Sequence, residues 1–493
     1  MGGVRTALYN YLYAKKRGGD FIIRIEDTDS QRFVPGAEQY IIEALSWCGI
    51  IPDEGVDMAS GKVVEEASER HPHAPYRQSQ RRGLYRKYAD QLVESGWAYY
   101  AFDTAEELNA ARAAAEAAGQ TFIYNASTRS GLRNSLTMPA EEVAQLLESR
   151  TDWTVRFKMP QDRIVAMDDM IRGHVEVNTN TLDDKVLWKR ADELPTYHLA
   201  NIVDDHLMEI TEVIRGEEWL PSLPLHYLLY EAFGWQETQP KFAHLPLLLK
   251  PVGNGKLSKR DGDKMGFPVF PLNWKNSEGE TYHGYREDGY FPEAFVNLLA
   301  MLGWNPGTEQ EIFSLPELVE AFSIDKVSKS GAKFNPDKAK WYNKEYLRMM
   351  DDTDLAMAFI PILAENGISE ASFDMVKDVV TLIKERATFV KDFWDISWYL
   401  FKAPQEFAEK DAAKFWKEEN VAMAFEAMTS TASAEEMEEY IRSHEWPMGK
   451  VMNCIRLALT GASSGLGIGD IMGFIGHDEA LARMEFAKSK LSI

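Results

Sequence analysis

Apolar positions at the start of the chain follow first a helical and then a strand-like spacing. Residues 4–17 carry apolar side chains at i, i+3, i+4, i+7 and i+8, which predicts an amphipathic helix that ends at the glycine pair 18–19. The short, mainly apolar run 21–25 precedes the acidic segment 26–29 and predicts a buried strand with carboxylates at its end. Helix, turn and strand make half of a βαβ unit, and we expect the strand that would precede the helix to be missing.

Beyond residue 100 the pattern changes. Thr104 and Glu107 predict a capping box for a helix over the alanine-rich run 108–118, while residues 153–158 and 173–178 alternate as strands do. Buried strand and helix patterns return at 186–222. From about residue 352 onward the apolar spacing is helical, at 354–365, 372–393, 414–428, 434–443 and 449–459.

These patterns predict an α/β fold that is interrupted by an α+β insertion and followed by an all-helical domain. Doubly wound folds bind ligands at the carboxyl ends of their strands, so the loops there are the first place to look for a site. We expect the catalytic domain, of Rossmann type, at 1–99 and 186–262, the insertion at 100–185, a connector at 263–350 and the helical domain at 351–493.

Composition narrows the class of protein. The sequence has no run of about 18 apolar residues that would predict a membrane span, and its N-terminus does not resemble a secretory signal. Cys48 and Cys454 are the two cysteines, too few and too far apart in sequence for a disulfide framework or a cysteine-based zinc site. A reducing, cytoplasmic environment fits this usage.

The net charge of −23 argues, taken alone, against a nucleic-acid partner. Binding depends on local patches, however, and residues 326–348 contain seven basic side chains against two acidic ones, with Trp341, Tyr342 and Tyr346 among them. This basic segment can contact a nucleic acid. A solvated helix face with buried aromatic side chains is the plainer interpretation, and both stay open.

The sharpest chemical motif is KLSKR at residues 256–260, which has glycines on both sides. Lys256 and Lys259 on a mobile loop suit contact with a transferring phosphate, because ammonium groups compensate the charge on phosphoryl oxygens. An exposed basic turn is the alternative. Gly2 and Gly3 stand directly before the first predicted helix, where a nucleotide phosphate could approach the helix N-terminus, although a flexible leader is the plainer interpretation.

Other segments combine groups that suit an amino-acid ligand. Glu26 follows the predicted strand, where a carboxylate can hold an ammonium group or cap the next helix. Tyr197 and Asn201 are four residues apart and share a helix face. Arg215 can grip a carboxylate with two parallel hydrogen bonds.

A histidine- and aspartate-rich stretch at 198–206 resembles a metal site, but it lacks an evident third ligand. We interpret His198 and His206 as residues that pack on a helix face. No protein-bound metal is therefore predicted.

Together the motifs resemble those of the glutamyl-tRNA synthetases of the bacterial type, which are class I aminoacyl-tRNA synthetases. The resemblance covers nearly the whole chain, including residues 449–452 near its end. It implies a class I Rossmann-type catalytic domain, an acceptor-stem-binding insertion, a stem-contact connector and a helical anticodon-binding domain. Its motifs follow in the family's order at 2–8, 24–29, 75–79, 195–205, 214–219 and 256–260.

The resemblance implies a two-step reaction. The α-carboxylate of L-glutamate attacks the α-phosphate of ATP, which enters with Mg²⁺, and the resulting anhydride passes glutamate to the 3′-terminal adenosine of tRNA(Glu). The implied catalytic residues are Lys259, Lys256 and Ser258. The implied glutamate pocket is Glu26, Tyr197, Asn201 and Arg215, and the implied ATP contacts are Gly2, Gly3, Glu218, Leu247, Leu248 and Lys259.

The chain departs from the family at its start and in its insertion. The family's first strand, one pocket arginine and the first signature histidine would precede Met1, so we expect the chain as it stands to be inactive or nearly so. Some relatives carry a zinc cluster in the insertion, but residues 97–135 contain no cysteine or histidine, and zinc is not expected.

Two other functions compete with a monomeric, cytoplasmic glutamate–tRNA ligase. The first is a non-catalytic, tRNA-binding remnant of such an enzyme, which the missing strand supports and the otherwise complete pocket opposes. The second is a ligase that adenylates a small molecule, for which the helical domain would be unnecessary.

Overall fold

The computed structural model describes residues 1–29, 34–276 and 278–491, and the side chains of Lys259, Arg260 and Asp263 lie outside this description. The chain divides into two units, one of residues 1–288 and 292–339 and the other of residues 289–291 and 340–493. Helix α11, Pro336–Met349, passes from the first unit into the second, so the division falls inside the predicted connector.

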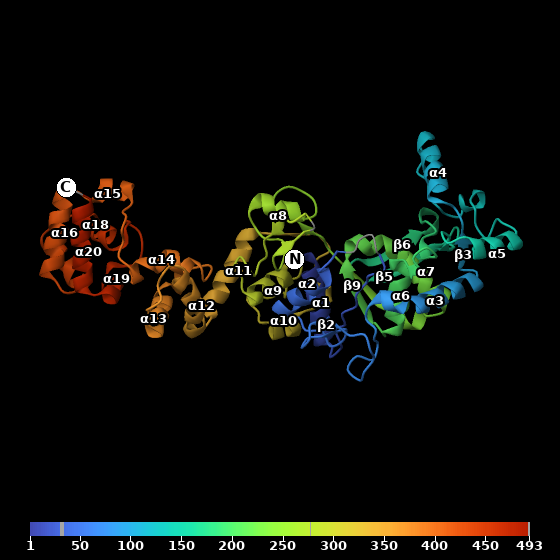
Figure 1. Ribbon diagram of the computed structural model, residues 1–493, viewed down its shortest axis with the longest axis horizontal. Helices are drawn as coiled ribbons and strands as arrows, with labels where there is room; N and C mark the ends of the chain where they lie inside the picture. Colours follow the sequence, from blue (N-terminus) through green and yellow to red (C-terminus); the bar gives the residue numbers. More distant parts are fainter. Residues whose placement is uncertain (30–33, 277, 492–493) are drawn as a thin grey trace. The chain divides into compact units, whose positions relative to one another are not determined.

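The first unit is built around a sheet with the strand order β6-β5-β10-β9 (Figure 1). β5 is parallel to β10 and β10 is parallel to β9, whereas β5 and β6 form an antiparallel pair. Buried residues of helices α3, α6 and α7 share one apolar core with Phe242 of β10. The bounds are β5 Ile164–Asp169, β6 Gly173–Asn178, β9 Glu212–Gly216, β10 Lys241–Leu245, α3 Arg82–Glu94, α6 Tyr197–Leu207 and α7 Leu223–Phe233.

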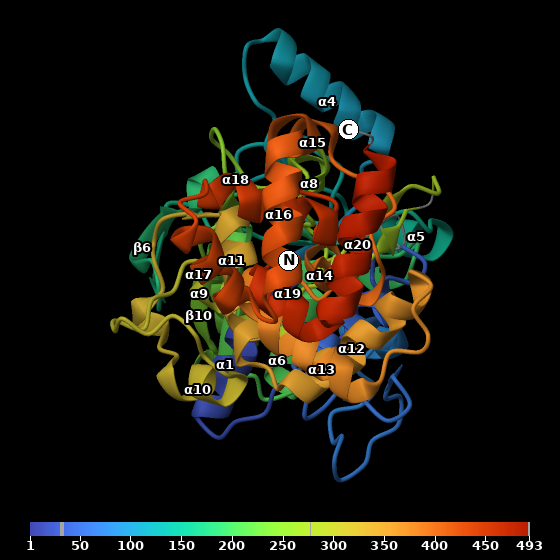
Figure 2. The ribbon, with the colours of Figure 1, turned by 90° about the vertical axis from the view of Figure 1, so that its left-hand side faces the viewer.

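The second unit is helical, as the apolar spacing predicts, and α16, α18 and α20 pack against one another in it (Figure 2). The helix predicted at 434–443 is α17, residue for residue. The single helix expected over 372–393 is wrong: α13 ends at Ile383, and Asp392 begins α14 by accepting hydrogen bonds from the backbone N–H groups of Thr388 and Phe389 at 2.9 and 2.8 Å. The bounds are α12 Asp352–Glu365, α13 Phe373–Ile383, α14 Asp392–Phe401, α15 Glu409–Phe415, α16 Glu418–Ser430, α17 Ala434–Ser443, α18 Met448–Thr460, α19 Ile468–Ile475 and α20 His477–Lys490.

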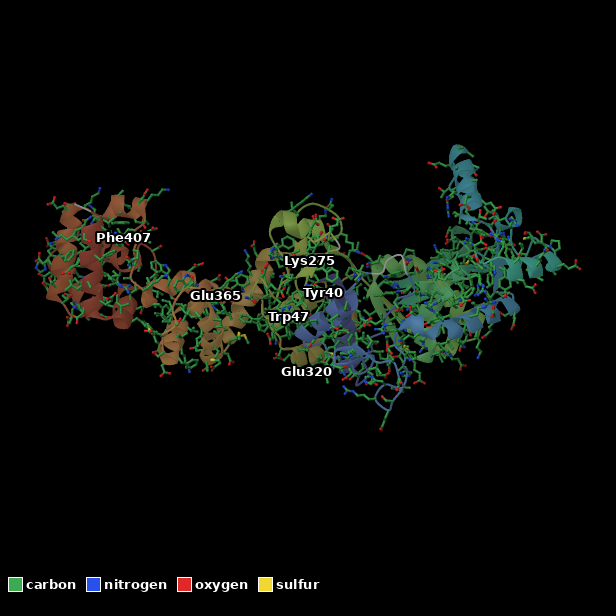
Figure 3. The ribbon with its side chains drawn as sticks, viewed as in Figure 1. Tyr40, Trp47, Lys275, Glu320, Glu365 and Phe407 are labelled. Atoms are coloured by element: carbon green, nitrogen blue, oxygen red, sulfur yellow. The ribbon has the colours of Figure 1, made fainter. Side chains whose placement is uncertain are left out.

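Aromatic side chains fix helix α2 in the first unit (Figure 3). The hydroxyl of Tyr40 donates to the carbonyl of Leu272 at 2.8 Å, its ring lies edge-on to Trp274, and Trp47 faces Phe295. The other elements of this unit are α1 Gly2–Lys16, α2 Ala37–Trp47, α8 Lys259–Met265, α9 Pro292–Met301, α10 Leu315–Ala321 and the strand pairs β1 Val56–Asp57 with β2 Lys62–Val63, β11 Leu248–Leu249 with β14 Ala332–Lys333 and β12 Trp274–Lys275 with β13 Thr281–Tyr282.

The strand predicted at 21–25 is wrong as a regular strand. Ile22 and Ile25 form isolated parallel bridges to Glu54 and Arg77, without a continuous ladder. The N–H groups of Ile23 and Ile25 bond to carbonyls on this one side. Alternate residues of an extended chain direct their backbone groups to opposite edges. The backbone N–H and carbonyl groups of residues 22 and 24 therefore face away from these partners.

A second sheet, with the antiparallel order β3-β4-β7-β8, joins β3 and β4, at the start of and within the predicted insertion, to β7 and β8, which lie beyond its predicted end at 185. The capping box of Thr104 and Glu107 is confirmed at the start of α4, as is the strand at 173–178. That strand, however, belongs with β5 to the sheet of β9 and β10, so strand pairing crosses the predicted boundary at 185. The bounds are β3 Ala98–Ala101, α4 Ala105–Ala117, α5 Ala140–Ser149, β4 Thr154–Phe157, β7 Val186–Lys189 and β8 Leu194–Pro195.

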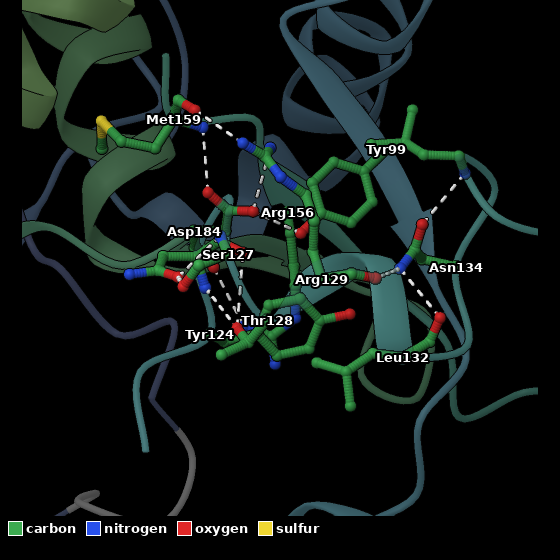
Figure 4. Close-up of polar contacts among 12 residues, drawn as sticks. Tyr99, Tyr124, Ser127, Thr128, Arg129, Leu132, Asn134, Arg156, Met159 and Asp184 are labelled. Carbon is green, nitrogen blue, oxygen red and sulfur yellow. Dashed lines mark hydrogen bonds and ion pairs between the residues drawn. The ribbon is translucent and has the colours of Figure 1, made fainter. Parts of the chain in front are cut away.

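A buried polar network holds this second sheet to the neighbouring loops (Figure 4). Asp184 accepts hydrogen bonds from the hydroxyl of Tyr99 at 2.6 Å and from the backbone N–H of Met159 at 3.0 Å. Nη1 of Arg129 lies 3.2 Å from the same carboxylate, and its Nη2 donates to the carbonyl of Met159 at 2.8 Å. The carboxylate and the guanidinium are both buried and neutralise each other.

In the part of the chain that the structure describes, no helix is long and apolar enough to cross a membrane.

Candidate active site

Arg215 lies in β9, near the carboxyl end of the parallel sheet, opposite His244 of β10. Only 7% of the residue is exposed. Its Nε donates to Nε2 of His244 at 3.0 Å, and its Nη1 donates to the hydroxyl of Tyr197 at 2.9 Å. Among the described residues, the partner of its Nη2 is the carbonyl of Trp219, at 3.5 Å. The guanidinium is thus held through two nitrogens, and the third is the least engaged.

The part of the chain that the structure describes provides no counter-ion for Arg215. Among the described residues, no carboxylate lies within 4.0 Å of its guanidinium, and every partner of that group is neutral or an imidazole. A buried charge without a partner is costly, and a guanidinium presents a fork of donors that matches a carboxylate. This arrangement favours the binding of an anionic ligand group.

Aromatic and imidazole rings surround that guanidinium. The ring of Tyr197 lies 4.3 Å from that of Trp219, and burial raises the pKa of Tyr197 to about 12. His226 Nδ1 lies 3.4 Å from Nη1 of Arg215, and His226 Nε2 lies 3.2 Å from Nδ1 of His198. Burial lowers the pKa of His198 to about 4 and holds the pKa of His226 well below its usual value. Both imidazoles are therefore neutral near pH 7 and can accept hydrogen bonds.

Arg24 contacts two of the predicted substrate-binding residues, Glu26 and Asn201. Its Nη1 donates to Asp205 at 2.8 Å and its Nη2 to Oε1 of Glu26 at 2.9 Å. The amide orientation that satisfies Asn201 directs its oxygen to Nη2 of Arg24 at 3.0 Å and its nitrogen to Asp205 at 3.3 Å. The Glu26 side chain is still 36% exposed, so its carboxylate can be reached by a cationic group.

A cavity of about 1050 Å³ opens beside this cluster, and Gly3, Glu26 and Asn201 are among the residues that line it. Residues 22–25 and β9 both contribute to its wall. No strand among the described residues joins these two edges, and the carbonyl of Ile214 accepts instead from Nδ2 of Asn10 at 2.8 Å.

Gly2 and Gly3 do not precede the first helix, which corrects the prediction. Helix α1 begins at Gly2, because the N–H of Arg5 already donates to the carbonyl of Met1 at 3.0 Å. The terminal ammonium of Met1 donates to the carbonyl of Val269 at 2.9 Å. A Cβ at either glycine would meet no atom within 4 Å. No described protein atom therefore requires glycine there, and an ATP contact at these positions stays a prediction.

The KLSKR segment ends in a capped helix rather than remaining a loop throughout. Ser258 is the N-cap of α8, and its Oγ and N–H donate to Asp261 at 2.5 and 2.9 Å. These bonds, led by that from the hydroxyl, lower the pKa of Asp261 to about 2. Nζ of Lys256 lies 3.1 Å from Oε1 of Glu218, which brings two of the predicted residues together. Lys259 is the first residue of α8, and its side chain lies outside the described residues.

Backbone bonds tie the predicted adenosine segment to its surroundings. The N–H of Leu247 donates to Oε1 of Glu217 at 2.9 Å, and its carbonyl accepts from Ala332 at 2.9 Å. The carbonyl of Leu248 accepts from Leu257 in the KLSKR segment at 2.7 Å. Leu247 and Leu248 thus connect that segment to Glu217 and to β14, and their contact with adenosine stays a prediction.

Sequence reasoning missed the residues behind Arg215. Asp169, His226 and His244 form its inner support, and Asp169 bonds to His244 at 2.6 Å. One signal was available for Asp169, which ends a strand at the sheet edge where doubly wound folds place ligands. His226 and His244 lie in apolar runs and gave no such signal. His206, in contrast, stacks on Trp235 with centroids 3.7 Å apart, and this agrees with its interpretation as a packing residue.

Over residues 1–29, 34–276 and 278–491, no group of three or more His, Cys, Asp or Glu side chains is arranged to hold a metal ion.

Comparison with known proteins decides the family. Residues 1–341 match the catalytic domain of the class I tRNA synthetases (E and Q), and residues 353–488 match an anticodon-binding domain. The chain belongs to the class I tRNA synthetases of the E and Q type. The synthetase therefore has the class I catalytic domain and the helical anticodon-binding domain that its motifs indicate.

Relatives of this synthetase are similar over its whole length. It is 55% identical over 500 residues to a glutamate–tRNA ligase of Flavobacterium johnsoniae, spanning all of this chain and 96% of the relative. It is 52% identical to the corresponding ligase of Bacteroides thetaiotaomicron, over 99% of this chain and 95% of the relative. The crystal structure of a glutamate tRNA ligase from Elizabethkingia meningosepticum in complex with its amino acid superimposes with a TM-score of 0.92 at 52% identity, covering 100% of this chain and 97% of that one.

Proposed function

We propose that this synthetase is a glutamate–tRNA ligase, which activates L-glutamate with ATP and transfers it to the 3′ end of tRNA(Glu). The observation that carries the proposal is Arg215, a buried guanidinium without a carboxylate partner among the described residues. Relatives that are more than 50% identical to the chain are glutamate–tRNA ligases, and this supports the same assignment.

The chemistry of activation assigns the two carboxylates of glutamate to different partners. The α-carboxylate must attack the α-phosphate of ATP, so a bidentate grip on it would weaken the nucleophile. Arg215 therefore takes the side-chain carboxylate, and Tyr197 orients its guanidinium. Glu26 receives the α-ammonium group, and Asn201 helps to hold that end of the pocket through Arg24.

The ATP site lies on the side of the KLSKR segment. Lys259 and Lys256 compensate the charge that develops on the phosphoryl oxygens, with Mg²⁺ entering as part of the ATP substrate. Ser258 shapes the segment by capping α8. Gly2, Gly3, Glu218, Leu247 and Leu248 complete the proposed ATP contacts.

The remaining segments serve tRNA. Residues 100–185 bind the acceptor stem, residues 263–350 contact the stem region, and residues 351–493 read the anticodon. The basic side chains at 326–348 include Lys338, which is paired with Glu311 at 2.5 Å, and Lys329 and Lys333, which are exposed. We also propose that the enzyme works in the cytoplasm as a monomer.

The decisive experiment is glutamate-dependent exchange of pyrophosphate into ATP, with and without tRNA. It is run on the 493-residue chain and on the same chain with the family's opening segment, from Arg-Phe-Ala-Pro-Ser-Pro-Thr-Gly through the first signature histidine, joined before Met1, and the more active form serves in the activity measurements below. We expect exchange with glutamate but not with glutamine, followed by glutamylation of tRNA(Glu).

The alternatives give different results. A tRNA-binding remnant would bind tRNA in both forms without exchange or glutamylation. A ligase for another small molecule would exchange pyrophosphate with that molecule and leave tRNA uncharged. Either result would contradict the proposal.

A further inference from the structure

Three neighbouring strands bring Asp169, His244 and Arg215 into one line. Asp169 ends β5, His244 lies in β10 and Arg215 lies in β9, with His244 and Arg215 in register across the parallel pair. All three are buried, with exposures of 4%, 0% and 7%. No polar solvent contact therefore competes with the bonds among them.

The first link fixes the tautomer of His244. Oδ2 of Asp169 lies 2.6 Å from Nδ1 of His244, while its Oδ1 accepts from the backbone N–H groups of Ile171 and Arg172 at 2.9 and 2.8 Å. Burial alone would raise the pKa of Asp169, but these bonds, led by that to His244, lower it below its usual value. An ionised carboxylate only accepts, so Nδ1 of His244 carries the hydrogen.

The second link follows from the first. With its hydrogen on Nδ1, a neutral His244 presents a lone pair on Nε2, which accepts from Nε of Arg215 at 3.0 Å. Burial lowers the pKa of His244, which keeps the ring neutral near pH 7. The guanidinium is thus held at Nε by an acceptor that carries no charge of its own.

We propose that Asp169 and His244 are positioning residues for carboxylate recognition: they aim the guanidinium of Arg215 at the ligand without neutralising it. A carboxylate in direct contact with Arg215 would compete with the substrate for the same charge. Asp169 instead contacts Arg215 through the imidazole of His244. The guanidinium therefore keeps its orientation, and its positive charge is left for the ligand. This inference rests on the proposed role of Arg215 in binding the glutamate side chain.

The test uses substitutions that change hydrogen bonding more than shape. Asp169→Asn is nearly isosteric, but its amide can donate to Nδ1 of His244 and shift the ring hydrogen to Nε2, where it opposes the Nε–H of Arg215. His244→Leu removes the acceptor, whereas His244→Gln restores an acceptor oxygen near the position of Nε2. The matched control is His206→Gln, because the partly buried ring of His206 stacks on Trp235 outside the site.

We expect Asp169→Asn and His244→Leu to raise the KM for glutamate about 10-fold in pyrophosphate exchange, with the KM for ATP within about 2-fold of wild type. His244→Gln should bring the KM for glutamate most of the way back from the value of His244→Leu to that of wild type. Asp169→Asn should have little further effect in the His244→Gln background, because a glutamine has no ring tautomer to fix.

Three results would overturn the proposal: an unchanged glutamate KM in both Asp169→Asn and His244→Leu, an equal rise in the KM for glutamate and ATP, or the same cost of Asp169→Asn in both backgrounds. Loss of cooperative unfolding in Asp169→Asn would also overturn it, in favour of a purely structural role. Wild-type enzyme that shows no glutamate-dependent exchange would instead refute the proposed function itself.

Discussion

Two buried arginines of the first unit differ in their partners, and the difference separates a binding group from a structural one. Arg129 lies against the fully buried carboxylate of Asp184, which also accepts from Tyr99 (Figure 4). Arg215 is equally buried, but His244 and Tyr197 hold it through neutral atoms. One guanidinium is satisfied by its own chain, and the other keeps its charge available.

The contrast shows that burial of an arginine is not by itself evidence for a site. A buried ion pair carries a large desolvation cost, which its partner and further hydrogen bonds must offset. The Asp184 network meets that requirement within the protein. The Arg215 network has no such carboxylate among the described residues, and we propose that the ligand supplies it.

The largest expected effect is on stability, from Asp184→Ala. Arg129 and the hydroxyl of Tyr99 would remain buried without their partner, so the free energy of unfolding of the first unit should fall by about 3–5 kcal/mol. Urea unfolding followed by intrinsic fluorescence measures this change. The matched control is Asp183→Ala, which removes a neighbouring, partly exposed pair with Lys185 and should cost less than about 1 kcal/mol. Equal losses in the two variants would contradict the assignment of Asp184 as the structural centre.

The second effect is on activity, from Arg215→Ala. We expect kcat/KM for glutamate to fall about 10²–10³-fold, because the substrate carboxylate loses its charged partner. The KM for ATP and the urea midpoint should change little, since Arg215 has no carboxylate of the described chain to leave unpaired. Arg163→Ala is the control, because it removes an arginine paired with Glu231 outside the site. A loss of stability as large as that of Asp184→Ala would place Arg215 in the structural class.

A smaller effect is expected from Tyr197→Phe. This change removes the hydroxyl that lies 2.9 Å from Nη1 of Arg215 and keeps the ring against Trp219. Loss of one hydrogen bond to a charged group should raise the KM for glutamate about 10-fold. The control is Tyr227→Phe, because the hydroxyl of Tyr227 donates to the carbonyl of Asp168. This substitution should leave the KM for glutamate near its wild-type value. If the two substitutions act alike, the hydroxyl of Tyr197 does not orient Arg215.

The smallest effect concerns the exposed pair of Lys256 and Glu218. Both side chains are about half exposed, at 58% and 47%, so Glu218→Gln should change the free energy of unfolding by less than about 1 kcal/mol. Thermal unfolding at low and high salt measures it. A destabilisation comparable with that of Asp184→Ala would show that exposure does not separate these pairs.

Local signals in the sequence predicted the elements well and long-range pairing poorly. The capping box of Thr104 and the helix at 434–443 depend on residues a few positions apart, and both are confirmed. The break before Asp392 was missed because the apolar spacing continues across it, whereas α13 ends at Ile383 and the carboxylate of Asp392, the first residue of α14, accepts hydrogen bonds from the backbone of Thr388 and Phe389.

The site shows the same division. Tyr197 and Arg215 were predicted from motifs, and the structure brings them together at 2.9 Å. Glu26 and Asn201 were likewise predicted, but their common partner is Arg24, which sequence reasoning did not assign to the pocket. The support from Asp169 and His244 depends on the register of parallel strands far apart in sequence, which periodicity does not reveal.

The most direct test of the account is the affinity of the enzyme for glutamate and for glutamine, measured by calorimetry in the wild type and in Arg215→Ala. The two ligands have nearly the same shape and differ in the side-chain charge that Arg215 is proposed to bind. We expect wild type to bind glutamate at least about 100-fold more tightly than glutamine, and Arg215→Ala to lose most of that preference. Equal wild-type affinities, or a preference that survives the substitution, would contradict the claim that Arg215 is kept free for the substrate carboxylate.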